Sequence, residues 1–200
     1  LGNPHLVWAS GYNAPSEWNK GDIFYTYFNG ASWASPQNLS QSILGGYTTT
    51  TLNWQYKANC PSSSVQEAAV ANDKLYVIVN GGGTYEYNPA NNQWTAKASA
   101  PGGSPSGGGA AEVNGLIYVL GDYSGSIKIY NPGNNSWSTG AAIPASRSGM
   151  CVAAAGGNVY AIGGPNSTKN EMYNPTSNSW TTKAAIPTAR EYAAAATVNG

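Results

Sequence analysis

An all-β fold, a β-propeller of four-stranded antiparallel blades, is predicted by a repeat that runs through most of the chain. A Tyr-Asn-Pro triplet recurs every 43 residues, a Trp follows each of these Tyr residues by seven positions, and a second Pro keeps the same spacing. The positions are Tyr87, Tyr130 and Tyr173, Trp94, Trp137 and Trp180, and Pro101, Pro144 and Pro187. A period of about 40–50 residues with strand-forming composition is typical of one propeller blade.

Each repeat contains four short runs of strand-forming residues, which are separated by Gly, Asn and Pro. The expected strands are residues 67–71, 75–79, 84–87 and 94–98, then 110–113, 116–120, 126–130 and 136–139, then 150–155, 158–162, 169–173 and 179–184. The first two strands of each repeat are joined by pairs such as Asn114-Gly115. Such pairs favour a type I′ hairpin turn, in which both central residues need φ > 0. No window indicates an amphipathic helix.

The repeat also predicts where side chains pack. The Ala-rich runs at 153–155 and 193–196 are expected in the innermost strands, where blades crowd around the axis. The repeated Trp residues are expected in the core between neighbouring blades, where more volume must be filled. Ligand binding by these Trp residues is the alternative, but a residue that recurs at every period serves the repeat itself.

These features resemble kelch repeats over residues from about 54 to 200. The shared pattern is an apolar strand, the pair Gly163-Gly164, then Tyr, Trp and a Pro-x-x-Arg turn. Earlier repeats depart from it, because Gly121-Asp122 and Val79-Asn80 replace Gly-Gly and Ser104 replaces the turn Arg. The resemblance implies a propeller of four-stranded blades. Kelch propellers serve mostly as binding scaffolds, and a minority are extracellular oxidases or sugar-processing enzymes.

The first 40 residues differ from this pattern. Residues 22–33 contain a strand, an Asn-Gly turn and a Trp, and they resemble repeats of bacterial sialidase-like propellers without the Asp of the Asp-box. Residues 41–53 contain only half a repeat, so either one blade is degenerate or residues are missing from this stretch. Strand 5–9 is expected to join the C-terminal end in one blade, which closes a single domain over residues 1–200. The count is then about five blades with one degenerate; the alternative is a fragment of a larger propeller.

Composition argues against several partners and for export. Charged residues make up 9% of the chain and the formal net charge is zero, so nucleic acid is not an expected partner. No apolar stretch approaches the ~20 residues that span a bilayer. The polar, uncharged composition predicts an extracellular or cell-surface protein. The sequons at Asn38, Asn134 and Asn166 fit a glycoprotein. Cys60 and Cys151 are expected as two separate thiols.

Counting excludes several enzymes within these residues. The three-arginine carboxylate site of a sialidase cannot form, because the chain contains only Arg147 and Arg190. A copper site of the galactose-oxidase type needs two histidines, and His5 is the single one. No Cys/His cluster has zinc spacing, and the nine carboxylates show no paired motif. We therefore expect no catalytic residues, no metal and no cofactor.

Binding is expected on one end of the blades. In an antiparallel blade with strands a to d, the a–b and c–d turns lie at one end and the longer b–c and d–a loops at the other. Varied loops on a rigid scaffold usually carry function. The side chains expected to bind ligand there are Tyr12, Trp18, Tyr123, Arg147, Arg190 and Tyr192. For the two period-equivalent Arg residues, a structural bond to the backbone carbonyls of a neighbouring blade is the alternative.

Two functions follow as hypotheses. The first is a non-catalytic extracellular propeller that recognises a protein or glycan through the b–c and d–a loops, with self-assembly through a degenerate blade as a variant. The second is a sugar-processing enzyme of the kelch type, whose site is completed by residues outside this chain. The first is preferred because no catalytic set is present.

Overall fold

The computed structural model describes residues 55–103, 107–121 and 124–196, together with the backbone of three strands among the first 54 residues. The chain divides into two compact units, Leu1–Gln55 and Tyr56–Val198. The predicted closure of a single domain by the N-terminal strands concerns contacts between these units and stays a prediction.

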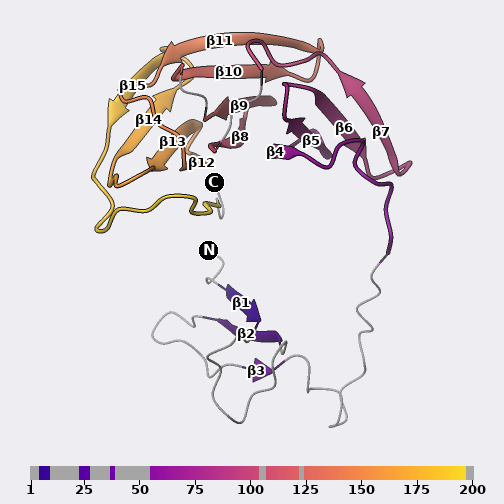
Figure 1. Ribbon diagram of the computed structural model, residues 1–200, viewed down its shortest axis with the longest axis horizontal. Helices are drawn as coiled ribbons and strands as arrows, with labels where there is room; N and C mark the ends of the chain where they lie inside the picture. The colour runs from indigo at the N-terminus through magenta and orange to yellow at the C-terminus, as the bar shows by residue number, and fades with distance from the viewer. Residues whose placement is uncertain are drawn as a thin grey trace. The chain divides into compact units, whose positions relative to one another are not determined.

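The second unit contains three antiparallel four-stranded sheets, each with its strands in chain order (Figure 1). The first is β4 (Val65–Ala71), β5 (Lys74–Val79), β6 (Thr84–Asn88) and β7 (Gln93–Lys97). The second is β8 (Gly109–Val113), β9 (Leu116–Leu120), β10 (Ser126–Asn131) and β11 (Ser136–Ala142). The third is β12 (Met150–Ala155), β13 (Asn158–Gly163), β14 (Asn170–Asn174) and β15 (Ser179–Thr182). These sheets confirm the predicted a-to-d strands.

The first unit contains a three-stranded antiparallel sheet of β1 (His5–Ala9), β2 (Ile23–Tyr27) and β3 (Gln37–Asn38). His5 pairs with Tyr27 and Ala9 with Ile23, so the whole of β1 is matched by β2. The expected strand at residues 5–9 is therefore confirmed.

The a–b hairpins of the three sheets have the turn chemistry that the sequence predicts. Both central residues of each turn have positive φ, which is the requirement of a type I′ turn. The pairs are Asn72 (50°) and Asp73 (58°), Asn114 (53°) and Gly115 (79°), and Gly156 (56°) and Gly157 (74°).

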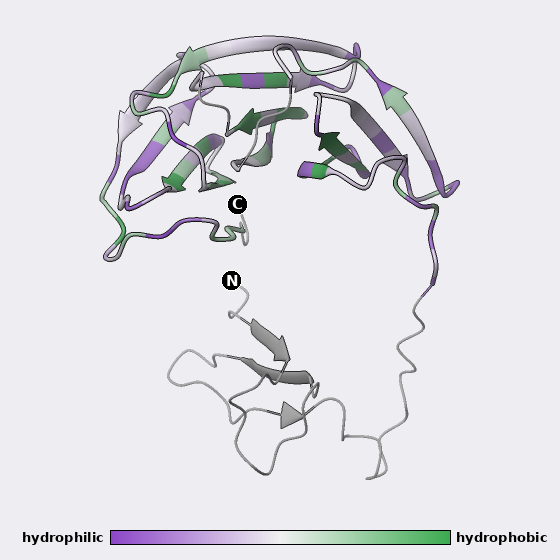
Figure 2. Cartoon of the chain, viewed as in Figure 1, coloured by the Kyte–Doolittle hydropathy of each residue, from purple (hydrophilic) through white to green (hydrophobic). Residues whose placement is uncertain are grey.

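The three sheets stand side by side with β4, β8 and β12 innermost and β7, β11 and β15 outermost (Figure 1). Hydrophobic residues concentrate in strands such as β5 and β9, and the outermost strands are paler or hydrophilic (Figure 2). Two clusters of buried side chains fill the spaces between sheets. One includes Tyr76, Ile117 and Tyr130, and the other includes Tyr118 and Tyr173. The core therefore lies between neighbouring blades.

A Tyr, an Asn and a Trp make the same contact in each sheet, which we call the Tyr–Asn–Trp clamp. In the third sheet, Trp180 Nε1 donates to the Ala141 carbonyl of the preceding sheet at 2.8 Å. Asn178 Oδ1 accepts the Tyr173 hydroxyl at 2.7 Å and the Ala141 N–H at 2.7 Å. The other clamps are Tyr130, Asn135 and Trp137 on Ala98, and Tyr87, Asn92 and Trp94 on Ala58.

The clamp explains the strictest part of the repeat. Each Tyr faces its Trp across the c and d strands, with ring centroids 5.1–5.2 Å apart. The Tyr rings are buried and the Trp rings are half-buried. The expected inter-blade role is confirmed for Trp137 and Trp180, which pack against the clusters between sheets and also bond to the neighbouring blade. Trp94 bonds to Ala58, which lies outside the described strands.

One expected strand is absent. Residues 193–196, predicted as an innermost strand, are described and form no strand. These Ala residues are exposed within the part of the chain that is described. A strand needs a partner for its backbone groups, and the partner predicted from sequence is β1 of the other unit.

Candidate functional site

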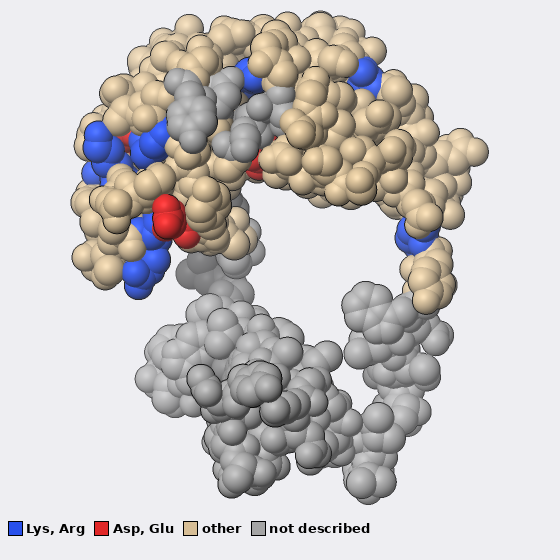
Figure 3. Space-filling model, viewed as in Figure 1, with Lys and Arg blue, Asp and Glu red and all other residues tan. Residues whose placement is uncertain are grey.

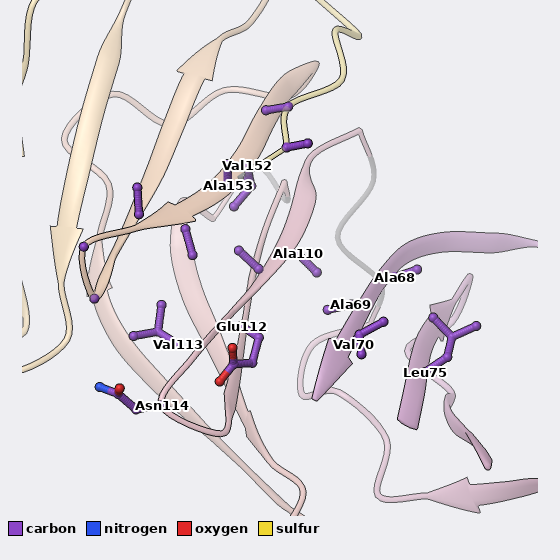
Figure 4. Close-up of a pocket in the computed structure, with 17 residues that line it drawn as sticks. Ala68, Ala69, Val70, Leu75, Ala110, Glu112, Val113, Asn114, Val152 and Ala153 are labelled. Carbon is purple, nitrogen blue, oxygen red and sulfur yellow. The ribbon is translucent and has the colours of Figure 1, made fainter. Parts of the chain in front are cut away.

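Two cavities open at the axial side of the second unit. The larger one, about 820 Å³, is lined mainly by small residues of β4, β8 and β12. Figure 4 shows Ala68, Ala110 and Ala153 among the side chains around it. Its one charged lining residue among those described is Glu112, and Glu112 Oε1 accepts the Gly115 N–H of its own hairpin turn at 2.5 Å. This axial cavity therefore offers little chemistry for selecting a ligand.

The second cavity, about 410 Å³, lies where successive d–a loops meet the innermost strands, and we call it the Glu67 pocket. It lies at the end of the blades where binding is predicted. It is lined by Gln66, Glu67, Gly107, Gly108, Ser148, Met150, Tyr192 and Ala193. Three d–a loops and the start of β4 thus contribute to one small space.

Hydrogen bonds tie these loops to one another. The Tyr192 N–H donates to the Gly149 carbonyl at 2.8 Å, and the Gly149 N–H donates to the Gly107 carbonyl. Towards β4, the Gly108 N–H instead donates to a side chain, Glu67 Oε1, at 3.1 Å. The walls of the pocket are therefore held by a chain of bonds that ends on the Glu67 carboxyl group.

Glu67 is positioned by an irregularity in β4. The register shifts between Val65 and Glu67 opposite β5, which is the pattern of a β-bulge at Gln66. A bulge redirects the side chains that follow it, and bulges are over-represented near functional sites. Only 6% of the Glu67 surface is exposed. Burial raises the pKa of its carboxyl group from 4.5 to about 7, and the hydrogen bond from Gly108 offsets part of this effect.

Tyr192 covers the loops beside this carboxyl group. Its ring lies close to two glycines, because a Cβ atom built on Gly107 or Gly149 would be 3.6 or 3.7 Å from it. The side chain is 75% exposed, and its φ of 51° is unusual for a bulky residue. Strained backbone of this kind clusters at ligand sites. Among the predicted binding residues that the structure describes, Arg147, Arg190 and Tyr192, it is Tyr192 that lines this pocket.

Arg147 makes its contacts inside the protein. Its guanidinium group is buried, forms an ion pair with Glu171 and donates to the carbonyls of Gly163, Ala161 and Ala145. Gly164 leaves room for it, since a Cβ atom there would lie 2.9 Å from Arg147 Cδ. These contacts match the structural alternative for this residue.

Arg190 has the equivalent place in the repeat and a different environment. Its side chain is exposed, and Nη1 donates to the Ala189 carbonyl at 3.1 Å. Its backbone joins the d–a and b–c loops, because its carbonyl accepts the Gly164 N–H at 2.8 Å. The binding role of Arg190 stays a prediction, and it does not line the Glu67 pocket.

The remaining predicted residues are distributed differently. Tyr12, Trp18 and Tyr123 lie outside the described residues. Asn134 and Asn166 are exposed, and Asn134 Oδ1 accepts the hydroxyl of its own sequon residue Ser136 at 2.6 Å, while Asn38 lies in β3. Glycosylation stays a prediction at all three sequons. Both cysteines, Cys60 and Cys151, are free thiols as expected.

Charged and metal-binding groups are sparse. Most of the visible surface of the described residues carries neither Lys or Arg nor Asp or Glu (Figure 3). In residues 55–103, 107–121 and 124–196, no cluster of three or more His, Cys, Asp or Glu side chains could hold a metal ion. No helix in the described part of the chain has the length and apolar character to cross a membrane.

The fold and the solved structures together define the class of this protein, a β-propeller. It is similar to the solved structure of YjhT, with 19% sequence identity and a TM-score of 0.59 over 66% of this chain. The match spans about half (53%) of the YjhT chain, and at this identity it shows the fold alone. No protein-family model and no curated protein matches the sequence, so the kelch resemblance stays a prediction.

Two sets of residues were missed from sequence, and each carried a signal. The clamp residues Asn92, Asn135 and Asn178 share the 43-residue spacing of the Tyr and Trp positions. Glu67 could have been found by the opposite criterion, because the other two repeats have no acidic residue at its position. Counted back from the a–b turns, its equivalents are Gly109 and Cys151. The repeat itself therefore does not require an acidic residue at this place.

We expect Glu67→Gln to stabilise the protein at pH 8. Between pH 4.5 and about 7 the folded state holds a proton on Glu67 that the unfolded state releases, so stability falls as pH rises through this window. The neutral amide removes this loss, which is at most about 3.5 kcal/mol at about 1.4 kcal/mol per pKa unit. Urea titrations at pH 4 and pH 8 measure the difference.

The control is Glu191→Gln, at an exposed carboxylate next to the pocket residue Tyr192. It should follow the wild-type pH profile. A Glu67→Gln profile parallel to the wild type would show that the Glu67 carboxyl group is solvated as in the unfolded chain.

Proposed function

We propose that this protein is an extracellular, non-catalytic, kelch-type propeller that binds a protein or glycan ligand at the Glu67 pocket. The observation that carries the proposal is the meeting of three d–a loops around a buried acid that the repeat does not require. Residues that recur at every period hold the blades together, as the clamp does. Residues that break the repeat beside the d–a loops are free to serve a ligand.

Two further features support binding rather than structure as the purpose of this pocket. Tyr192 presents an exposed aromatic ring, and aromatic side chains with few rotatable bonds are common anchors for sugars and proteins. The second feature is the φ of 51° at Tyr192, because strained backbone clusters at ligand sites. An extracellular setting is supported by the uncharged polar composition and by the three sequons.

The test begins with the full chain on a glycan array and in capture from a secreted-protein library, which together identify a ligand. We expect Tyr192→Ala to weaken binding of that ligand at least tenfold and to leave unfolding unchanged, because its ring is largely exposed. Asn174→Ala, in a c–d turn at the other end of the third sheet, is the control and should shift stability instead, since Asn174 Oδ1 accepts two backbone N–H groups.

Hydrogen exchange on the complex separates this site from the alternatives. Protection of residues 107–109, 148–150 and 190–193 is the expected pattern. Protection confined to residues 40–55 would instead assign binding to the segment predicted as a degenerate blade, and the pocket proposal would fail.

A sugar-processing enzyme is the second candidate function. The observation in its favour is the Glu67 carboxyl group, whose pKa of about 7 suits general acid–base catalysis near neutral pH. Turnover of a glycan by the full chain, lost in Glu67→Gln, would support this candidate over simple binding.

A further inference from the structure

Three carboxylate side chains are buried in the described part of the second unit, and they are Glu67, Glu86 and Glu171. Two of them have cationic partners. Glu86 contacts Lys74 at 2.9 Å and Lys97 at 3.1 Å, and Glu171 is paired with Arg147. Glu67 has no Lys or Arg partner among the described residues and accepts one backbone N–H.

This difference in partners changes the pKa values of Glu86 and Glu67 in opposite directions. Burial opposes ionisation of Glu86, yet hydrogen bonds from Tyr76, Lys74 and Lys97 lower its pKa to about 2. With burial and without a cation, the pKa of Glu67 instead rises to about 7. An ionised carboxylate in this place lacks the positive charge that buried anions normally require.

The lining of the pocket favours one kind of ligand group. Glu67 is the one charged side chain among the described lining residues, so an anionic ligand would meet repulsion and no compensating cation. A cation would restore the missing charge. Ser148 offers a hydroxyl acceptor, and Tyr192 offers an aromatic face of the kind that attracts ammonium groups.

In the described part of the chain, charged and titratable groups on the neighbouring strands have partners other than Glu67. On β5, Lys74 and Tyr76 are bound to Glu86. On β8, Glu112 is bound to the Gly115 N–H. On β10, Lys128 donates to the Gly103 carbonyl at 2.9 Å. Tyr192 is the other titratable side chain among the described residues that line the pocket.

We propose that the Glu67 pocket binds a ligand through a primary ammonium group, which forms an ion pair with the Glu67 carboxylate beside the ring of Tyr192. This inference rests on the proposed binding function and narrows it to cationic ligands. A lysine side chain and an amino sugar both carry such a group, and the test distinguishes these two sources.

The test is isothermal titration calorimetry of the full chain with matched pairs of probes at pH 7. Nα-acetyl-lysine methylamide is compared with its Nε-acetylated form, and glucosamine with N-acetylglucosamine. The cationic member of at least one pair should bind at least tenfold more tightly than its neutral partner. The pair that shows this difference identifies the source of the ammonium group.

Variants and pH make the test specific for Glu67. Glu67→Gln should abolish the preference for the cationic probe, and Asp73→Asn, at an exposed acid in an a–b turn, should preserve it. The lysine probe stays charged up to pH 8, so its affinity for the wild type should rise about tenfold from pH 6 to pH 8 as Glu67 ionises. The urea midpoint of each variant checks that it is folded.

The proposal would be overturned by equal binding of charged and neutral probes, by an affinity that falls as pH rises, or by an unchanged preference in folded Glu67→Gln. The absence of any amine binding would also overturn it. If the array ligand still depended on Tyr192 in that case, the binding function would stand and only the cationic ligand class would be wrong.

Discussion

Replacing Trp137 with Ala should lower the free energy of unfolding by about 3 kcal/mol, the lower end of the range for deleting a large aromatic side chain. The Trp137 ring packs on Tyr130 with centroids 5.1 Å apart and against the core cluster between the first two sheets. Its Nε1 also holds the Ala98 carbonyl of the neighbouring sheet at 2.8 Å. The variant loses this packing and the hydrogen bond together, which a urea titration measures.

Two further variants separate these contributions. Trp137→Phe keeps an aromatic ring and loses the hydrogen bond, so its cost should be near 1 kcal/mol, the typical net value of one such bond (about 0.5–1.5 kcal/mol). Tyr56→Ala removes a fully exposed aromatic side chain and should leave the unfolding midpoint unchanged. Equal losses in Trp137→Ala and Tyr56→Ala would refute the role of the clamp in stability.

Arg147→Met should be at least as damaging, with an expected loss of about 3–5 kcal/mol. The substitution removes the cation that faces Glu171, whose exposed fraction is 3%, and leaves a carboxylate buried without compensation. It also frees the carbonyls of Gly163 and Ala161. Thermal and urea unfolding of the full chain measure the loss.

The period-equivalent Arg190→Met is the matched control, because its side chain is exposed. Its stability should equal that of the wild type. Adding Glu171→Gln to Arg147→Met should recover a large part of the loss, since the uncompensated charge is then removed. A double variant as unstable as Arg147→Met would place the cost in packing rather than in charge.

The fold could be predicted from sequence because the same turn residues and the same Tyr and Trp positions recur in each blade. Type I′ turn pairs such as Asn114-Gly115 fix where strand a ends and strand b begins, because only residues that tolerate positive φ fit the turn. A Trp at a constant spacing marks each d strand. Residues 193–196 were predicted as a strand from their Ala content and do not form one. Strand formation there depends on a partner, which local composition cannot supply.

The candidate site could be predicted only in part. Topology placed the d–a loops at one end of the blades, and Tyr192 lies in the pocket that they form. Glu67 was not predicted, because burial and the lack of a cation emerge only when distant loops meet around it. Arg147 and Arg190 are equivalent in sequence, and only the structure shows that one is buried in an ion pair and the other exposed.

The Tyr–Asn–Trp clamp has a direction along the chain. Each clamp reaches backwards, from Trp137 to Ala98 and from Trp180 to Ala141, across 39 residues in both cases. The outer strand of a blade therefore receives the hydrogen bond from the Trp of the clamp only after the following blade has been synthesised. During translation, each new repeat would supply the clamp contacts of the blade before it. The most recently made blade would always be the one whose outer strand still lacks these contacts.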